Sequence, residues 1–155
     1  MRWYRKISAD PNDLSPIPDA VEWFQEEYEE ARKELQIKGQ KIDAVAATIP
    51  GLIEYRFAQL QELETILKYL EEIEKRKLVE KTKWIMENYP RAISETVAKQ
   101  YAQAEQEVFD IACVKFEVAT VRNNFLALFK GIEAMHYQIK NIVDLRKAGL
   151  DDATF

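Results

Sequence analysis

A cluster of cations near the middle of the chain carries the most suggestive chemistry in the sequence. Lysines and arginines are concentrated between residues 75 and 91, and aromatic residues stand among them: Lys75, Arg76, Lys77, Lys81, Lys83, Trp84, Tyr89 and Arg91. Single-stranded nucleic acid binding requires cations that follow a phosphate backbone beside aromatic rings that stack on bases. The alternative is an ordinary solvated helix face, because acidic residues interleave with the lysines and can pair with them: Glu71, Glu72, Glu74 and Glu80.

The beginning of the chain holds a second basic and aromatic group, made of Arg2, Trp3, Tyr4, Arg5 and Lys6. Two interpretations are open for it. It contacts nucleic acid in the same way as the first cluster, or it is an anchor that docks on a neighbouring subunit.

Other residues offer little for catalysis or metal binding. Glu133 and His136 have the Glu-x-x-His spacing of di-iron helical bundles, but the motif occurs once and His136 is the only histidine. Cys113 is the only cysteine, and a cysteine nucleophile normally needs a nearby base. The only candidate histidine for that role is His136. Glycine-rich phosphate loops are absent from the sequence. We therefore predict no enzyme activity, no metal and no cofactor.

Charge and cysteine content narrow the class of protein further. The formal net charge is −5, so any site for a polyanion must be a local basic stretch. A single cysteine excludes an intrachain disulfide and favours a reducing compartment. No apolar run approaches the roughly 20 residues that span a bilayer, and the first residues lack the apolar core of a signal peptide. We expect an unexported cytoplasmic protein without a membrane partner.

The sequence pattern predicts an all-α fold with three long helices. Prolines and turn-forming residues indicate an extended arm over residues 1–18, and residues 19–149 form one helical domain. The expected helices cover about 19–48, 50–88 and 94–148, with Asp19 and Ser94 as N-caps, Pro50 in a first turn and Gly149 as a stop. The apolar pattern stays in phase across Gly39, so we expect the first helix to continue through it. Residues 150–155 are expected to be a loose tail.

The third expected helix keeps an unbroken seven-residue apolar repeat. Two positions of each heptad would face a partner helix, and we call the residues at these positions the seam. All of them are apolar: Ile111, Val114, Val118, Val121, Phe125, Leu128, Ile132, Met135, Ile139 and Ile142. A strict heptad makes a helix wrap around a partner, and roughly fifty residues at 1.5 Å each exceed the size of a compact globule. We therefore expect other subunits to bury much of this helix.

Residues beside the seam refine the expected assembly. Asp110 and Lys115, then Glu117 and Arg122, occupy positions that face each other between parallel neighbouring helices. Further along, an adjoining position is filled by residues that widen the apolar stripe: Phe129, His136 and Val143. A wide stripe favours a homo-oligomeric ring or bundle of more than two subunits.

The end of the third helix resembles a known family. The segment from Gly131 to Arg146, GIEAMHYQIKNIVDLR, is similar to the C-terminal helix of the UvsY-type recombination mediators of tailed bacteriophages. Its most distinctive part is IKNIVDLR at 139–146, and the stretch from Ala104 to Val108 leads into the segment without a gap. The resemblance covers roughly the last sixty residues, whereas the proline-rich arm and the first helix depart from the family pattern.

This resemblance implies a function. In that family the C-terminal helix drives ring-like assembly, and a basic segment before it binds single-stranded DNA. That segment corresponds here to the region of Lys81, Lys83 and Trp84. The mediator helps to displace single-strand-binding protein and to load a RecA-like recombinase, in the cytoplasm of the infected bacterial cell. Our first hypothesis is such a mediator.

Two other hypotheses stay open. The second is a helical scaffold or adaptor that acts only through protein partners and does not bind oligonucleotides. The third is a four-helix-bundle enzyme or metal protein, for which the single Glu133 to His136 motif is the only support.

Overall fold

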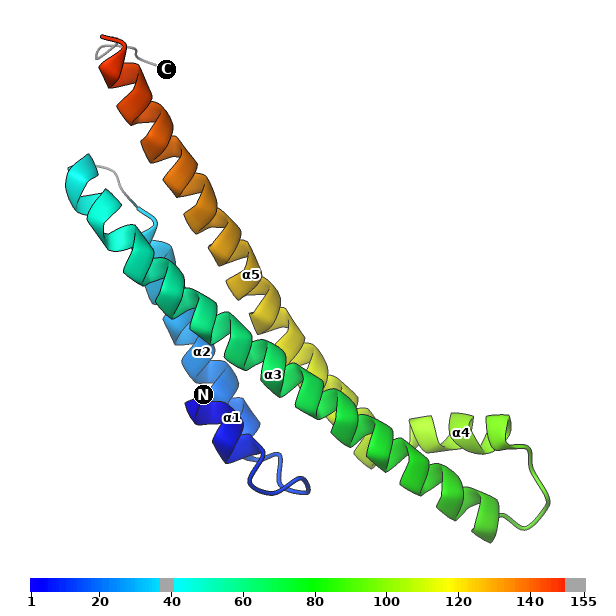
Figure 1. Cartoon of the computed structure of the whole chain (residues 1–155). Helices are drawn as coiled ribbons and strands as arrows, with labels where there is room; N and C mark the ends of the chain where they lie inside the picture. The colour runs from blue at the N-terminus through cyan, green and yellow to red at the C-terminus, as the bar shows by residue number, and fades with distance from the viewer. Residues whose placement is uncertain (37–40, 150–155) are drawn as a thin grey trace.

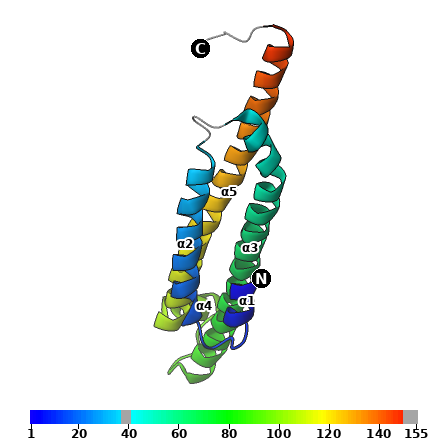
Figure 2. The ribbon, with the colours of Figure 1, turned by 90° about the vertical axis from the view of Figure 1, so that its left-hand side faces the viewer.

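The computed structural model describes residues 1–36 and 41–149 of the 155-residue chain. Within them the regular structure is entirely helical, which confirms the all-α class (Figure 1). The elements are α1 (Arg2–Ile7), α2 (Pro16–Glu34), α3 (Ile42–Asn88), α4 (Glu95–Ala104) and α5 (Gln106–Lys147). The long helices α3 and α5 run antiparallel, and α2 packs along α5. Figure 2 shows α1 beside α3, near the N-terminal end of α2.

Helices α1 and α2 differ from the arm and the first helix that we expected. The prediction of an extended arm over residues 1–18 is wrong, because residues 2–7 form α1. Trp3 and Ile7 are buried there, and Trp3 lies 6.3 Å from the ring of Trp23 on α2. The buried carboxylate of Glu62 on α3 accepts hydrogen bonds from the backbone N–H groups of Trp3 at 2.7 Å and Tyr4 at 3.0 Å. A cap supplied from a distant helix is a tertiary contact, which explains why local pattern did not reveal α1.

The boundary between the first two long helices is also displaced from its expected place. Helix α2 ends at Glu34, and α3 begins at Ile42, so one helix over 19–48 is wrong. Gly39, through which we expected the helix to continue, lies outside the described residues. Pro50 sits inside α3 and not in its first turn. Val45 and Ile49, one turn apart, are buried in the core, so packing offsets the hydrogen bond that Pro50 cannot make.

The main core lies between α5, α2 and α3. Its largest fully buried side chains include Phe24 on α2, Leu63, Ile66 and Leu70 on α3, and Phe125 on α5. Eight seam residues of α5 are buried in this single chain, and Val114 and Ile142 are partly buried. The expectation that other subunits must cover the seam is therefore wrong, because α2 and α3 cover it. Assembly into a ring or bundle stays a prediction.

The third expected helix is divided in two. Ser94 is the N-cap of α4 as expected, with its Oγ accepting a hydrogen bond from the N–H of Val97 at 3.3 Å. Glu105 then adopts an extended conformation, with φ −63° and ψ 136°, which separates α4 from α5. The turn lets Ala98 and Ala102 pack against Ile85 on α3 in a second, smaller core. Gly149, at φ 74°, follows α5 where the stop was expected.

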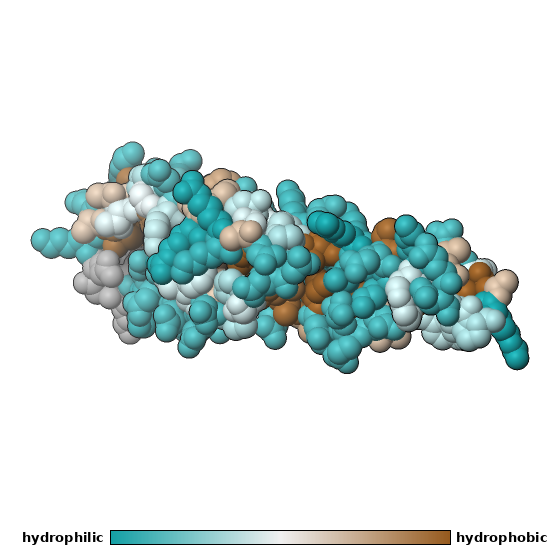
Figure 3. Space-filling model, turned by 90° about the horizontal axis from the view of Figure 1, so that it is seen from below, coloured by the Kyte–Doolittle hydropathy of each residue, from teal (hydrophilic) through white to brown (hydrophobic). Residues whose placement is uncertain are grey.

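Most of the surface is hydrophilic when the molecule is viewed from below, although apolar side chains reach it near the middle and toward the α4 end (Figure 3). Among the described residues, no helix is both long enough and apolar enough to cross a membrane.

Candidate nucleic-acid interface

The predicted basic cluster lies at one end of the elongated molecule. We call this end the tip and define it as residues 75–104, which comprise the last part of α3, α4 and the loop between them. Helix α3 extends here beyond the main core, and the tip has its own small core of Ile85, Ala98 and Ala102. A helix that leaves the core can present side chains on more than one face.

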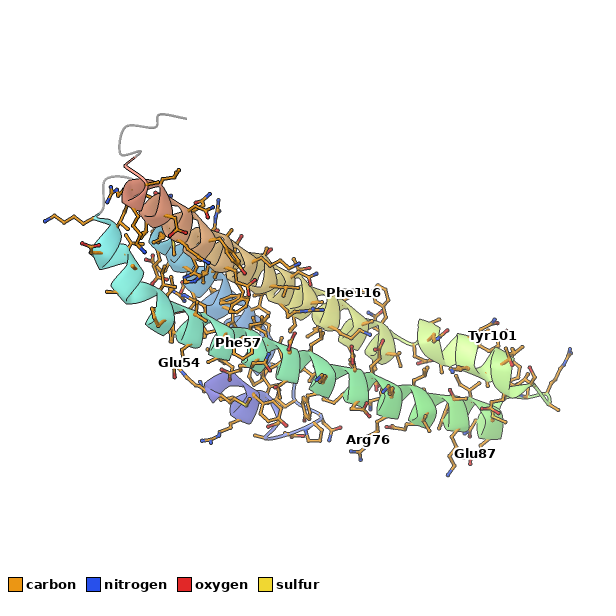
Figure 4. All side chains as sticks on the ribbon, turned by 45° about the horizontal axis from the view of Figure 1, so that its top comes forward. Glu54, Phe57, Arg76, Glu87, Tyr101 and Phe116 are labelled. Atoms are coloured by element: carbon orange, nitrogen blue, oxygen red, sulfur yellow. The ribbon has the colours of Figure 1, made fainter. Side chains whose placement is uncertain are left out.

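The helical period distributes the cluster over three faces of α3. Lys77, Lys81 and Trp84 follow each other at intervals of four and three residues, so they share one face. Lys75 and Lys83 lie on another face, toward a groove between α3 and α4. Arg76 points away from α4 and α5 (Figure 4). The eight residues therefore do not form one continuous site.

Lys77 and Lys81 converge on one carboxylate. The Nζ atom of Lys77 lies 3.3 Å from one oxygen of Glu107, and the Nζ atom of Lys81 lies 3.2 Å from the other. Glu107 belongs to the first turn of α5. Hydrogen bonding to Lys81 and to Lys77 lowers the pKa of Glu107, and hydrogen bonding to Glu107 raises the pKa of Lys77. The pair is thus arranged to hold an oxyanion.

Aromatic side chains accompany these lysines. Trp84 is 60% exposed, and Tyr89 and Tyr101 are also exposed. Tyr89 and Tyr101 stack on each other with ring centroids 5.7 Å apart and planes 18° apart. Hydrogen bonding between the two hydroxyl groups raises the pKa of Tyr89. Exposed rings of this kind offer faces on which bases can stack.

Tyr101 was missed by sequence reasoning. It lies twelve residues beyond Tyr89, and only the turn at Pro90 returns α4 alongside α3. Residues two positions apart on a helix point in nearly opposite directions, and Lys99 lines the groove. Tyr101 therefore lies on the flank of α4 away from the groove, as Trp84 does on α3. A signal was present in the pattern of α4, where Ala98 and Ala102 mark the packed face and leave Tyr101 beside it.

The groove itself has a volume of about 610 Å³ and combines apolar side chains with lysines and glutamates. Val79, which is 69% exposed, and Met86 contribute its apolar surface. The other lining residues are Lys75, Leu78, Thr82, Lys83, Glu87, Glu95 and Lys99. The groove contains no aromatic ring, so it suits a peptide better than stacked bases.

Acidic neighbours pair with part of the cluster, as the alternative interpretation required. Lys75 contacts Glu72 at 2.6 Å, Lys77 contacts Glu80 at 3.5 Å and Lys83 contacts Glu87 at 3.9 Å. Exposed pairs of this kind contribute at most about 1 kcal/mol each, so phosphates can compete for the lysines. Arg76 and Arg91 are exposed and form no ion pair within residues 1–36 and 41–149.

The N-terminal basic group is not a second stacking site. Trp3 is buried, and Tyr4 packs edge-on against Tyr69 at 6.0 Å, so neither ring is free for bases. The ammonium group of Lys6 lies over the Trp3 ring, 4.5 Å from its centroid. The anchor interpretation describes this group better, although the surface on which it docks belongs to the same chain.

Two of the four charged residues beside the α5 seam find partners within the chain. The ammonium group of Lys115 pairs with Glu74 on α3, and Asp110 accepts a hydrogen bond from Gln106 at 2.6 Å. The predicted pairing of Asp110 with Lys115 of a parallel neighbour is therefore not what this fold presents, because Lys115 faces α3.

The remaining chemistry-bearing residues are dispersed. Cys113 is partly buried, and Glu133 and His136 are exposed on α5. Over the part of the chain that the structure describes, no three His, Cys, Asp or Glu side chains gather as a metal site would require.

Fold and site together define an elongated all-α protein whose protruding tip carries lysines and exposed aromatic rings. Comparison with protein-family models, with curated proteins and with solved structures found no match.

Proposed function

We propose that this protein is a homo-oligomeric recombination mediator that binds single-stranded DNA and helps to load a RecA-like recombinase in place of single-strand-binding protein. The observation that carries the proposal is the face of Lys77, Lys81 and Trp84 on α3, with Tyr101 beside it on α4. The resemblance of residues 131–146 to UvsY-type mediators supports the same function and places it in the cytoplasm of an infected bacterial cell.

The chemistry of this face suits an unpaired strand. Lysine ammonium groups contact phosphates in any sequence, and exposed rings stack on any base, so binding does not require a particular sequence. Two lysines and two or three rings make a weak site in one chain. Assembly of several chains would place such sites at high effective concentration, which raises the overall affinity without any new contact.

The stacking contribution is tested by replacing Trp84 with alanine. We expect Trp84→Ala to weaken binding of a fluorescent poly-dT strand about tenfold, because a base stacked on an aromatic ring contributes about 1–3 kcal/mol. Fluorescence anisotropy across a salt series measures the affinity. Val79→Ala is the matched control, since Val79 is an exposed residue on the groove side of the same helix. Equal affinities for Trp84→Ala and the parent protein would refute the assignment.

A second candidate function is a scaffold or adaptor that acts only through protein partners. The groove between α3 and α4 favours it, because the exposed side chains of Val79 and Met86 lie among charged residues there. This candidate predicts no salt-sensitive binding of poly-dT at physiological ionic strength. The anisotropy titration of the unmodified protein therefore distinguishes the two functions.

A further inference from the structure

The carboxylate of Glu107 bridges the two lysines to which the proposed function assigns phosphate binding. Its two oxygens meet the ammonium groups of Lys81 at 3.2 Å and of Lys77 at 3.3 Å. A phosphodiester has the same charge and also presents two non-bridging oxygens, so it can accept hydrogen bonds from the same two lysines. The lysine side chains are only 22% and 24% exposed, so they are held over the carboxylate, unlike the freely exposed Lys75 and Lys83.

We propose that Glu107 occupies the phosphate site of Lys77 and Lys81 in the free protein, and that a single strand must displace it in order to bind. This inference rests on the proposed function and adds the regulation of its site. Glu107 acts as a competitor within the chain. Its removal leaves Lys81 without an ion pair among the described residues and leaves Lys77 with Glu80 alone.

Displacement of Glu107 is possible without unfolding of α5. The Glu107 side chain is 57% exposed, so it can turn into solvent by rotating about its own bonds. Val108 and Ile111, which follow Glu107 on α5, are buried and keep the first turn of α5 in place. The ion pairs that break involve a carboxylate that is more than half exposed, so solvent screens them and each contributes little to stability.

The displacement also links the site to the junction between α4 and α5. Lys77 and Lys81 belong to α3, whereas Glu107 follows the extended residue Glu105 that separates α4 from α5. When a phosphate replaces Glu107, the ion pairs between α3 and the first turn of α5 are lost. Strand binding thereby loosens the junction while the buried seam residues remain packed.

Glu80 is the other acidic group that faces these lysines, at 3.5 Å from Lys77. It lies on α3, three residues after Lys77, and it forms no ion pair with Lys81 within the described residues. Glu80 therefore contacts one ammonium group from the same helix, whereas Glu107 bridges both from another helix. Only Glu107 has the geometry of the displaced anion.

The test compares Glu107→Gln with Glu117→Gln in poly-dT anisotropy titrations at one fixed salt concentration. Glu117 is the matched control, because it is exposed on the same helix and forms no ion pair among the described residues. Glu107→Gln is expected to bind about three- to tenfold more tightly than the parent protein, because the strand no longer has to break two partly exposed ion pairs. Glu117→Gln is expected to change affinity less than about twofold, because it removes the same charge without freeing a lysine.

A second comparison shows whether the effect passes through the lysines. In a chain that already carries Lys77→Gln and Lys81→Gln, the further change Glu107→Gln should leave poly-dT affinity unchanged. If the parent protein binds poly-dT and Glu107→Gln binds equally well, this inference fails and the proposed function stands. If neither the parent protein nor Glu107→Gln binds, both fail. Binding by Glu107→Gln alone would support the competitor role in its strongest form.

Discussion

Arg56 shows how much one buried side chain contributes to the position of two helices. It lies on α3 and is 3% exposed, and its guanidinium donates hydrogen bonds of 2.8 Å to Glu27 and 2.8 Å to Glu34, both on α2. Glu27 also accepts hydrogen bonds from Gln59 at 2.7 Å and Tyr55 at 3.1 Å. A buried guanidinium is tolerated only when such partners satisfy it, so this cluster holds α2 beside α3.

The acid dependence of stability follows from Glu27. Burial raises the pKa of Glu27, but hydrogen bonds from Gln59, Arg56 and Tyr55 outweigh it, so the pKa lies below its ordinary value of 4.5. A carboxyl group with a lowered folded-state pKa stabilises the fold fully above its unfolded pKa, and this stabilisation is lost as the pH falls through the folded value.

We expect Glu27→Gln to lower the free energy of unfolding near neutral pH by about 1–2 kcal/mol, because it weakens hydrogen bonds to a charged group. The difference from the parent protein should shrink as the pH falls below the ordinary value of 4.5. Urea unfolding across a pH series measures both effects. Glu26→Gln, at an exposed neighbouring position, should show neither effect. A pH-independent difference would contradict the role of ionised Glu27.

The longest helix contains a local weak point. Pro50 and Gly51 are adjacent inside α3. Pro50 lacks the N–H that would bond to the carbonyl four residues earlier, and glycine loses more backbone freedom than any other residue when it becomes helical. The helix continues through both because Val45 and Ile49 before them, and Leu60 and Leu63 after them, are buried in one core. Packing of the element outweighs the local preference of two residues.

Substitution at this weak point should stabilise the protein. A Cβ atom at Gly51 would meet nothing within 4 Å, so Gly51→Ala is expected to raise the free energy of unfolding by about 0.5–1 kcal/mol. Pro50→Ala should add about 1 kcal/mol or more by restoring a helical hydrogen bond. Urea denaturation of each variant gives the values. A loss of stability in Pro50→Ala would mean that the proline ring, which lies near Ile53 and His136, contributes packing that alanine lacks.

The whole molecule buries the heptad face of α5 within one chain. Phe125, at the centre of that face, is buried between Phe24, at 5.9 Å, and Tyr28, at 6.1 Å, both on α2. If other subunits buried this face, as we expected from the sequence, a charge at Phe125 would dissociate them. In this fold it must enter the core of the single chain, so the chain itself should unfold.

Phe125→Asp is therefore expected to abolish cooperative folding, because loss of a core phenylalanine alone costs about 3–5 kcal/mol and an unpaired charge adds to it. Circular dichroism reports the folding and sedimentation velocity reports the assembly. Phe116→Asp is the matched control, since Phe116 is 65% exposed on the same helix and points away from α3 (Figure 4). If the parent protein is oligomeric and Phe125→Asp is a folded monomer, this prediction is contradicted, and the seam is a contact between subunits as the sequence suggested.

Several features followed from the sequence by itself because they depend on residues close together in the chain. The helical class, the cap at Ser94 and the stop at Gly149 are local. The apolar face of α5 is also local, because a helix gathers residues three and four positions apart whatever surrounds it. The lysines and rings of the tip were recognisable for the same reason, as neighbours in sequence.

The tertiary structure decided what covers each face. An apolar repeat predicts that one face of a helix is buried, but it does not predict which partner buries it. Here α3 runs antiparallel to α5 and covers its apolar face together with α2. Contacts between distant residues decided three further features. Glu62 caps α1, packing keeps α3 helical across Pro50, and Tyr101 stacks on Tyr89. The same contacts placed Glu107 between Lys77 and Lys81. Such pairings depend on the path of the whole chain, which no local spacing of residues records.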